Sequence, residues 1–419
     1  MEHAISLAGT IFGILLSCCY AYQVVYIILT FVKKFPEHRE EAKPNRFAVL
    51  ICARNEELVL PDLLDCIRSQ TYPAERITTF VMADNCTDRT AEVAREKGAV
   101  VYTRFNKELV GKGYAMEELL AHIAEDYPEN PFDGYFVFVA DNLLDEHYVE
   151  EMNRTFSDGY SVVTSYRNTK NYADNWISAG YALWFLHEAR HLNQGRFLAN
   201  SCCAISGTGF MFSHKILEKH GGWPFHLLTE DIEFTAECAT TGEKIGYCRD
   251  AVFYDEQPVT FRQSWKQRMR WVKGYIQVFQ KYGKKLAAGA VRGKLACFDM
   301  MMNNLPALFF SLIGLLGNAA FLVIAIVEKY SILPILFSLW SLFWGLYGVV
   351  FFLGALTLAT EWKNIYATPA QKIKHLFMFP VFMMTFLPIA VCAFFERVNW
   401  EPIEHKRKRS LKEIRRADD

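Results

Sequence analysis

The chain carries almost no net charge and no recognisable cysteine framework, and both absences exclude classes of protein. Its 45 Lys and Arg residues balance 46 Asp and Glu residues, which leaves a net charge of -1. A globally basic protein that binds nucleic acid by neutralising phosphates is therefore excluded. The 11 cysteines are scattered, and no CxxC pair or His/Cys group has zinc spacing. We expect reduced thiols rather than disulfides or structural zinc.

Apolar residues, by contrast, are abundant. Hydrophobic residues make up 52% of the 419-residue chain and aromatic residues 15%, with a mean hydropathy of +0.05. This composition excludes intrinsic disorder, which requires few large apolar residues and a high net charge. The length predicts two or three folding units.

Four apolar stretches are long enough to cross a bilayer, which takes roughly 20 residues. They run from Ala4 to Val32, Leu305 to Val327, Ile332 to Thr360 and Leu376 to Phe395. The first is too long for a signal peptide, and no small-residue cleavage site precedes the basic segment that follows it. The sequence therefore predicts an integral membrane protein.

The distribution of basic residues predicts which side of the membrane each segment faces. No Lys or Arg precedes the first stretch, and several follow it: Lys33, Lys34, Arg39, Lys43 and Arg46. Positive charges mark cytosolic flanks, so we expect the long central region to be cytosolic and the protein to lie in the plasma (inner) membrane. The lysines between the third and fourth stretches predict a cytosolic loop there too.

The fourth stretch gives conflicting signals. If it crosses the membrane, the basic tail at residues 406–409 lies outside, against the charge rule. Pro380 and Pro388 allow a re-entrant or interfacial segment instead, which keeps the tail inside. The positive-inside rule is less reliable for spans late in a chain, so the basic tail does not exclude a crossing, and the sequence slightly favours one. The predicted organisation is a membrane helix at 1–33, a cytosolic domain at 34–285, an interfacial helix at 286–304, three membrane segments within 305–396 and a basic tail at 397–419.

The central region has the pattern of an α/β domain with a parallel sheet. Short, continuously apolar runs that end in polar residues are typical of strands buried on both faces. The predicted strands are Phe47–Ala53, Ile77–Met82, Ala99–Tyr102 and Phe136–Val139, with helices at Leu58–Ser69 and Thr87–Lys97. Ligands bind beyond the carboxyl ends of such strands, so one crevice is expected to collect Glu56, Asp84 and Asp141.

Seven motifs in this region occur in the order found in a known family. They are FAVLICARNEE, VMADNCTDRT, GKGYAMEELL, FVFVADN, SGTGF, TEDIEF and QRMRW, between Phe47 and Tyr275. Together they resemble the family 2 glycosyltransferases, inverting enzymes with the GT-A fold, a Rossmann-like nucleotide-sugar-binding α/β fold, here inserted between transmembrane helices. The QxxRW motif with flanking spans is similar to the processive synthases of cellulose, hyaluronan, chitin oligosaccharides and poly-N-acetylglucosamine.

For the donor, the resemblance implies a UDP-sugar. It places Asp84 at the uracil base, Ala53 and Glu56 near the nucleoside, and Lys112 at the diphosphate. On the residues alone, Asp84 also suits a turn before a helix N-cap. Lys112, between two glycines, is equally compatible with a solvated helix start.

Asp141 is the candidate metal ligand for Mg²⁺ or Mn²⁺, which would neutralise the diphosphate leaving group. The family usually has Asp-x-Asp here, but this chain reads Val139-Ala140-Asp141-Asn142, so the first acid is missing. Asn142 or water would then complete the metal shell; a metal-free or weakly metal-dependent enzyme is the alternative.

Asp231 is the expected general base, with Glu230 beside it. Inversion requires a carboxylate that removes the acceptor hydroxyl proton as the oxygen attacks the anomeric carbon. The two acids also suit the N-terminus of a helix, where they interact favourably with its dipole, and Thr229 would cap that helix.

Gln267, Arg270 and Trp271 are spaced so that one helix face carries all three. The resemblance implies a diphosphate clamp beside an aromatic platform for the acceptor sugar, while an amphipathic helix at the membrane surface fits the same pattern. Gly207, Thr208 and Gly209 would line the acceptor side, although a plain turn explains these glycines equally well.

Three functions follow from this pattern. The first is processive synthesis and translocation of a β-linked polysaccharide, with an oligomer or accessory export subunit helping to form the channel. The second is transfer of one sugar to a lipid-linked acceptor, with the spans as anchor and lipid groove. The third, suggested only by Val139, is a non-catalytic scaffold. UDP-GlcNAc is the first candidate donor and UDP-glucose the second; no nucleic-acid partner is expected.

Overall fold

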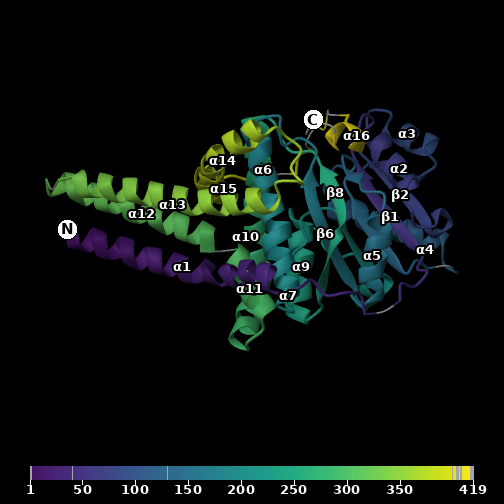
Figure 1. Ribbon diagram of the computed structural model, residues 1–419, viewed down its shortest axis with the longest axis horizontal. Helices are drawn as coiled ribbons and strands as arrows, with labels where there is room; N and C mark the ends of the chain where they lie inside the picture. The colour runs from purple at the N-terminus through teal and green to yellow at the C-terminus, as the bar shows by residue number, and fades with distance from the viewer. Residues whose placement is uncertain are drawn as a thin grey trace.

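The computed structural model describes residues 2–39, 41–129, 131–304, 306–329, 331–398, 400–402, 405 and 408–415. An α/β domain (residues 47–255) forms one end of the molecule, and the long helices α1 (Glu2–Val32), α12 (Pro306–Val327) and α13 (Leu333–Thr360) project side by side from the other (Figure 1). We call these three helices the bundle.

The α/β domain is built on an eight-stranded sheet of order β3-β2-β1-β4-β7-β6-β8-β5. The strands are β1 Phe47–Ala53, β2 Ile77–Asp84, β3 Val100–Arg104, β4 Gly134–Phe138, β5 Leu143–Leu144, β6 Val162–Thr169, β7 Phe210–Ser213 and β8 Ile245–Asp255. Strands β3, β2, β1 and β4 are parallel, as the sequence pattern predicts. The complete sheet is mixed, because β7, which was not predicted, runs antiparallel to both β4 and β6, and β5 runs antiparallel to β8.

Strand β1 shows why the first half of the sheet could be recognised. Phe47, Val49 and Ile51 pack into a core on one face, and Ala48 and Leu50 pack into a second core on the other. Both faces are covered, so the strand is continuously apolar rather than alternating.

Helices cover both faces of this sheet. The first face carries α2 (Leu60–Arg68), α3 (Thr90–Glu96) and α5 (Tyr148–Ser157). The opposite face carries α4 (Lys112–Asp126), α8 (His214–His220) and α9 (Glu230–Thr241). A short 3₁₀ turn, η1 (Ala74–Arg76), precedes β2. This sandwich positions the carboxyl ends of the parallel strands at one open edge.

A second set of helices joins the α/β domain to the bundle. It comprises α6 (Trp176–His187), the π-helical segment η2 (Glu188–Asn193), α7 (Gln194–Leu198), α10 (Phe261–Val291) and α11 (Leu295–Asn304). Helix α10 continues past the predicted boundary at residue 285 and ends at Val291. A turn with Gly293 in the left-handed region (φ +79°) then separates it from α11. The predicted interfacial helix at 286–304 is therefore divided between two helices.

Three described helical segments are long and apolar enough to cross a membrane: Gly13–Val32, Leu333–Thr360 and Pro369–Phe395. The second predicted span is represented by a shorter apolar segment, Leu316–Val327. Its predicted first residue, Leu305, lies outside the described residues, as do Lys406 and Arg407 of the tail.

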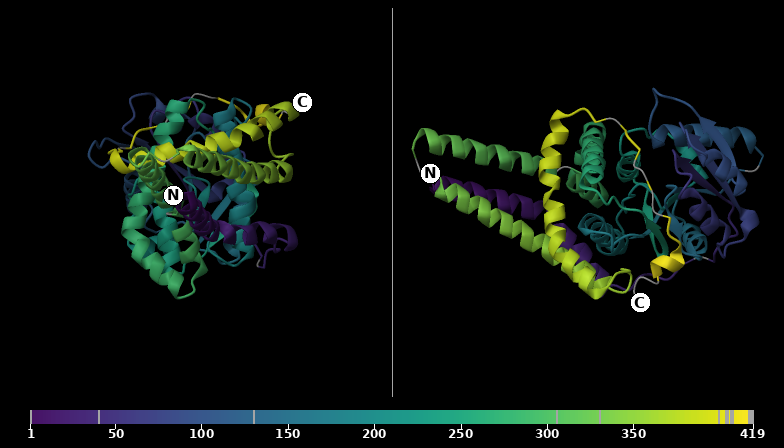
Figure 2. Two further views of the ribbon diagram at one scale, coloured as in Figure 1. Left: turned by 90° about the vertical axis from the view of Figure 1, so that its left-hand side faces the viewer. Right: turned by 90° about the horizontal axis from the view of Figure 1, so that it is seen from above.

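The fourth stretch lies across the bundle rather than alongside it. It forms α14 (Pro369–Met384) and α15 (Phe386–Phe395), which run across the base of the bundle (Figure 2, right). At the start of α14, Gln371 donates a hydrogen bond to the Ala173 carbonyl (3.5 Å). Near the end of α15, Lys273 donates to the carbonyls of Ala393 and Glu396 (both 3.1 Å). Both ends therefore contact the same side of the molecule, which supports the interfacial alternative over the crossing that the sequence slightly favoured.

The tail continues from α15 onto the α/β domain. Arg409 pairs with Asp174 (3.0 Å) and Arg415 with Asp145 (2.8 Å). Helix α16 (Leu411–Arg415) inserts Ile414, which is 3% exposed, beside β5 and β8. This arrangement removes the charge conflict, because the basic tail lies on the side of the domain.

We expect a tag appended to the tail to share the accessibility of the α/β domain. In sealed vesicles with the domain outward, added protease should remove the tag and digest the domain together, and in vesicles of opposite orientation both should be protected. A tag cleaved only when the domain is protected would show that α14 and α15 together cross the bilayer.

Candidate functional site

Three predicted acidic residues lie at one edge of the sheet. Glu56, Asp84 and Asp141 follow or end strands β1, β2 and β4, which are neighbours in parallel register. All three side chains are buried, with 3–7% of the residue surface exposed. Ala53, the last residue of β1, lies at the same edge. The expected shared edge is present, and the expectation that these residues line one nucleotide-binding crevice stays a prediction.

Asp84 is held by a buried arginine. Its carboxylate accepts a hydrogen bond from Arg104 Nη1 (2.8 Å), and the Arg104 Nε donates to Glu118 (2.8 Å). Helix α3 begins at Thr90 with Arg89 at the N-cap, so residues 85–89 form a turn between Asp84 and the helix, and the alternative of a turn that leads to a helix N-cap is also compatible with the structure. The ion pair fixes the orientation of Asp84 at the end of β2.

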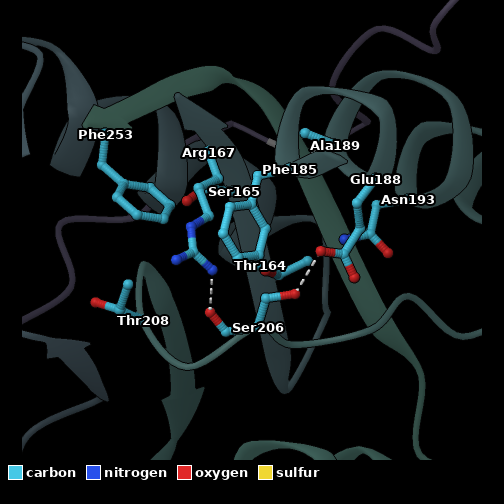
Figure 3. A pocket seen from close by; sticks show the side chains of 10 residues that line it. All are labelled: Thr164, Ser165, Arg167, Phe185, Glu188, Ala189, Asn193, Ser206, Thr208 and Phe253. Carbon is cyan, nitrogen blue, oxygen red and sulfur yellow. Dashed lines mark hydrogen bonds between the residues drawn. The ribbon is translucent and has the colours of Figure 1, made fainter. Parts of the chain in front are cut away.

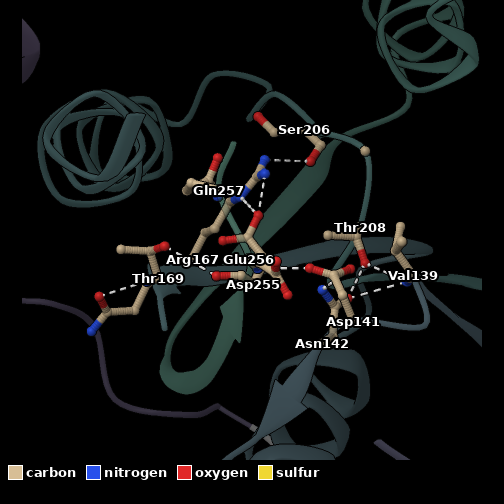
Figure 4. Close-up of polar contacts among 12 residues, drawn as sticks. Val139, Asp141, Asn142, Arg167, Thr169, Ser206, Thr208, Asp255, Glu256 and Gln257 are labelled. Carbon is tan, nitrogen blue, oxygen red and sulfur yellow. Dashed lines mark hydrogen bonds and ion pairs between the residues drawn. The ribbon is translucent and has the colours of Figure 1, made fainter. Parts of the chain in front are cut away.

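Asp141 and its neighbours form a polar network at the end of β4 (Figure 4). Asp141 Oδ2 accepts a hydrogen bond from the Glu256 backbone (2.6 Å). Asn142 Oδ1 accepts from the Thr208 hydroxyl and from the Val139 backbone N–H (3.2 Å). The Asn142 oxygen is thus occupied within the protein, which argues against its completing a metal shell. Thr208, predicted at the acceptor, also ties its loop to this network.

Glu56 contacts a residue that the sequence gave no reason to choose. Its Oε1 lies 2.9 Å from Nδ1 of His405 in the tail, and its Oε2 is buried without a partner among the described residues. Burial raises the pKa of Glu56. Burial disfavours the His405 cation, but Asp141 and Glu56 outweigh it and raise the pKa of His405 to about 9. The tail therefore contributes a positive charge beside Glu56 and Asp141.

Asp231 lies in the first turn of α9, as predicted, but Thr229 makes no capping hydrogen bond. Glu230 pairs with Lys112 (2.9 Å), and Lys112 also donates to the Gly207 carbonyl. Burial and the Glu230 carboxylate raise the pKa of Asp231 to about 7, against the opposing charge of Lys112. A carboxylate that titrates near neutral pH is suited to general-base catalysis.

We expect the substitution Glu230→Gln to shift the acidic limb of the plot of kcat/KM against pH to lower pH. The catalytic form of Asp231 is the deprotonated one, so activity in the native chain should rise through about pH 7. Removing the neighbouring negative charge favours ionised Asp231 and lowers its pKa. Initial rates between pH 5 and 9 measure the shift. An acidic limb that stays in place or moves to higher pH would contradict the assignment of Asp231 as the general base.

The QxxRW residues share one face of α10 beside Asp231. Charges on Glu230 and Asp231 both act on Arg270, whose pKa burial lowers. Gln267 Oε1 and Arg270 Nε are buried without partners among the described residues. Trp271 packs edge-on against Tyr181 and Phe185, with ring centroids 5.7 and 6.0 Å away. The face thus combines a fixed indole with polar atoms available to a ligand.

The basic residues of α10, which also suit a helix at the membrane surface, contact the C-terminal part of the chain. Lys266 pairs with Glu401 (2.7 Å), and the fully buried Arg268 donates to Thr385 between α14 and α15 (2.7 Å). Helix α10 therefore carries the QxxRW residues on one face and contacts α14 and α15 on another.

The two predicted acceptor glycines have different structural roles. Gly207 (φ +78°) faces Asp231, whose Oδ2 would lie 3.8 Å from a Cβ at this position. Gly209 (φ +66°) packs so closely on Phe253 that a Cβ would meet the ring at 2.1 Å. Gly207 is thus at the site, whereas Gly209 is required for packing.

A cavity on the other side of the Gly207 loop was not predicted. It is lined by Thr164, Ser165, Arg167, Phe185, Glu188, Ala189, Asn193, Ser206, Thr208 and Phe253, and its empty volume, including open solvent, is about 250 Å³ (Figure 3). Eight of these residues come from β6, α6, η2 and β8, which carry none of the seven motifs, whereas Ser206 and Thr208 belong to the SGTGF motif. Asp255 at the end of β8 follows the same polar-strand-end rule as Asp84 and could have been found that way.

No group of three or more His, Cys, Asp or Glu side chains in the described part of the chain could hold a metal ion. A single carboxylate such as Asp141 is nevertheless compatible with Mg²⁺, which commonly binds one or two carboxylates together with substrate phosphates.

Comparisons with known proteins identify the family. The model described as Glycosyltransferase like family 2 matches residues 44–274, more than half of the chain, and the chain belongs to this family. Probable glycosyltransferase YdaM of Bacillus subtilis (strain 168) is 26% identical over 311 residues, covering 70% of each chain. The beta-monoglucosyldiacylglycerol synthase of Synechocystis sp. is 25% identical over 309 residues, covering 71% of this chain and 62% of that protein. The poly-beta-1,6-N-acetyl-D-glucosamine synthase of Staphylococcus epidermidis is 21% identical over 319 residues, covering 74% of each.

The fold has a counterpart among solved structures. Mannosyltransferase PcManGT from Pyrobaculum calidifontis, in complex with GDP-Man and Mn²⁺, has a TM-score of 0.56 and covers 94% of this chain and 98% of that chain, at 17% identity. This likeness confirms the predicted GT-A fold, and the family confirms the enzyme class. Processivity stays a prediction, because the relatives include both a lipid glycosyltransferase and a polysaccharide synthase.

Proposed function

We propose that this family 2 glycosyltransferase transfers a sugar, with inversion, from a UDP-sugar to a hydroxyl group of a lipid-linked acceptor at the membrane surface. The observation that carries the proposal is the position of Asp231. Its carboxylate, with a pKa raised to about 7, faces Gly207 next to a cavity whose wall also contacts the bundle. The active site would face the cytosol, with the bundle anchored in the plasma (inner) membrane.

The donor is assigned to the crevice at the ends of β1, β2 and β4. Ala53, Glu56 and Asp84 would contact the nucleoside. The diphosphate would lie near Lys112, at the N-terminus of α4, where backbone N–H groups favour anions. Bound phosphate oxygens would give the buried Arg270 Nε the partner that it lacks among the described residues, and Gln267 would orient the donor from the same helix.

Asp141 would hold Mg²⁺ or Mn²⁺ together with the diphosphate oxygens. A bound divalent ion neutralises the charge that develops on the leaving diphosphate. The protein's own residues carry the remaining steps: Asp231 accepts the proton of the acceptor hydroxyl, Glu230 and Lys112 set the charge around Asp231, and Trp271 offers an aromatic edge to the acceptor.

The exposure of the bundle favours a lipid-linked acceptor over a translocated polymer. Only 12% of the apolar window of α1 and 17% of that of α13 is buried. In the part of α13 that the structure describes, buried residues lie near the two ends: Ile335, Gly354, Thr357 and Leu358. Side chains that face outward suit an anchor surrounded by lipid, whereas a polymer channel requires helices that enclose a lumen.

Processive polysaccharide synthesis is the second candidate. It is supported by the similarity to the Staphylococcus epidermidis synthase and by Trp271 in the QxxRW motif, next to Arg270, on which the charge of Asp231 acts. It requires a channel formed by further copies or by an accessory export subunit.

One experiment separates the two functions. Purified full-length protein in lipid nanodiscs is incubated with Mg²⁺ or Mn²⁺ and a panel of labelled UDP-sugars, with GDP-mannose as an additional arm. We expect label to enter an organic-extractable product with one sugar per lipid. A long, insoluble polymer would support the second candidate, and transfer only from GDP-mannose would contradict the UDP assignment.

A further inference from the structure

The C-terminal tail contacts two groups that are assigned to the donor. We call the tail residues that make these contacts the strap: Trp400, Glu401 and His405. The strap follows α15, and the yellow tail continues from there along the α/β domain to α16 (Figure 2, right). One end of the strap meets Arg270 of the QxxRW motif on α10, and the other end meets Glu56 after β1. The strap therefore connects two elements that are far apart in the sequence.

At one end, the strap contacts the arginine that is assigned to the diphosphate. Arg270 Nη1 donates a hydrogen bond to the carbonyl oxygen of Glu401 (3.3 Å). The Cζ atoms of Arg270 and of Arg54, which follows β1, lie 6.0 and 5.5 Å from the centroid of the Trp400 ring. Cations at such positions are attracted to the face of an indole. The strap therefore competes with a phosphate oxygen for one N–H group of Arg270.

At the other end, the strap places a cation among carboxylates. His405 Nδ1 lies 2.9 Å from Glu56 Oε1, and the two side chains are 13% and 8% exposed. Although burial opposes it, Asp141, Glu56 and Glu256 raise the pKa of His405 to about 9. Asp141 is the residue assigned to Mg²⁺ or Mn²⁺, and a histidinium near it repels a second cation. The strap therefore compensates acidic residues that a divalent ion would otherwise compensate.

The strap itself is lightly packed, although the tail beyond it is firmly anchored. Arg415 pairs with Asp145 (2.8 Å), and Ile414, which is 3% exposed, lies beside β5 and β8. In the strap, by contrast, Glu401 is exposed and Trp400 is only partly buried. Segments with few buried apolar contacts open at low free-energy cost. The strap can therefore leave its contacts while α16 stays docked, and this tether keeps the strap close enough to return.

We propose that the strap is an autoinhibitory contact, which holds Arg270 and Glu56 in the resting chain and is displaced by a diphosphate bound with a divalent ion. The inference rests on the proposed function, because that function assigns these two residues to the nucleotide sugar. Two groups of the strap have counterparts in the ligand: the Glu401 carbonyl replaces a phosphate oxygen, and the His405 cation replaces the charge of the metal ion. Because only the open fraction of the chain binds nucleotide, the closed strap raises the apparent Kd.

The test measures calorimetric binding of UDP, GDP and inorganic pyrophosphate, each with Mg²⁺, to full-length protein in lipid nanodiscs. We expect His405→Gln and Trp400→Ala each to lower the Kd for UDP and for pyrophosphate about tenfold, because each variant removes a contact that holds the strap closed. Loss of the His405 charge would by itself weaken the binding of an anion, so tighter binding identifies displacement of the strap.

His38→Gln is the matched control. His38 Nδ1 also lies 2.9 Å from a carboxylate, that of Asp158, but it belongs to the segment between α1 and β1, and its side chain is 34% exposed. This variant should bind all three probes with the Kd values of the native chain.

Hydrogen exchange reports the position of the strap directly. In the native chain, the peptide that contains Trp400 and His405 should exchange faster after Mg²⁺ and UDP are added, because the bound nucleotide releases the strap. Slower exchange would overturn the proposal, since it would indicate a lid that closes over the nucleotide.

Failure of the strap and failure of the proposed function give different results. Tighter pyrophosphate binding in both variants, without sugar transfer from any UDP-sugar, would retain the strap and reject the transferase assignment. Sugar transfer with an unchanged or higher Kd in both variants would reject the strap alone. Binding of none of the three probes by any form of the protein would reject both.

Discussion

Asp231→Asn should lower kcat by about 10²- to 10⁴-fold, the usual contribution of a positioned general base, while the affinity for UDP stays the same. The amide has nearly the same shape as the carboxylate but cannot accept the acceptor proton. Donor contacts should persist, because Glu56, Asp84 and Arg270 lie on β1, β2 and α10 rather than on α9. Rates of sugar transfer and calorimetric UDP titrations measure the two effects separately.

A change of the same kind on the same helix provides the control. Glu237→Gln also removes one negative charge from α9, but Glu237 lies six residues further along, beside Tyr282 rather than the crevice. It should retain native kcat. Native turnover in Asp231→Asn, or an equal loss in both variants, would show that the base is another group.

Local physical rules were sufficient to predict where the residues proposed to bind the donor lie in the fold. Strand β1 is continuously apolar because it is covered on both faces, and its polar end marks where the crevice opens. The same rule identified Asp84 and Asp141, and helical spacing placed Gln267, Arg270 and Trp271 on one face. These features depend on residues close together in the sequence, so pattern alone recovers them.

The remaining contacts around the candidate site are encoded by no local pattern. Glu188 reaches the cavity because a π-helical segment interrupts a run that would otherwise read as one helix. His405 reaches Glu56 across 349 positions of sequence, through a tail that returns from α15. The antiparallel strand β7 also escaped prediction, since its position between β4 and β6 is set by pairing across the sheet.

The missing first acid of the Asp-x-Asp pattern has a local explanation. The Val139 backbone N–H donates to Asn142 Oδ1 and to the Thr208 hydroxyl (3.0 Å). The loop that carries Asp141 is thus shaped by backbone and amide contacts, not by the side chain at position 139. Loss of an acid there removes one candidate ligand without removing the geometry that presents Asp141.

One buried ion pair contributes to the attachment of α1 to the rest of the molecule, and Asp299→Ala should disrupt this ion pair. Arg196 of α7 donates to both carboxylate oxygens of Asp299 in α11 (2.7 and 3.1 Å), and both side chains are 0% exposed. Tyr22 and Tyr26 of α1 donate to the same carboxylate (2.8 and 3.1 Å). Removing Asp299 leaves a buried guanidinium and two hydroxyl groups without their acceptor, which should cost about 3–5 kcal/mol of folding free energy.

A double substitution distinguishes the buried charge from simple loss of packing. Arg196→Met combined with Asp299→Leu removes both charges and retains apolar volume, so it should be more stable than Asp299→Ala, because replacing a buried pair with apolar side chains is often neutral. Denaturant titration in mixed micelles, followed by tryptophan fluorescence, gives the ranking. If the double variant is as unstable as Asp299→Ala, the network holds α1 through its hydrogen bonds to Tyr22 and Tyr26 rather than by compensating the Arg196 charge. Tyr22→Phe with Tyr26→Phe should then cost as much as Asp299→Ala.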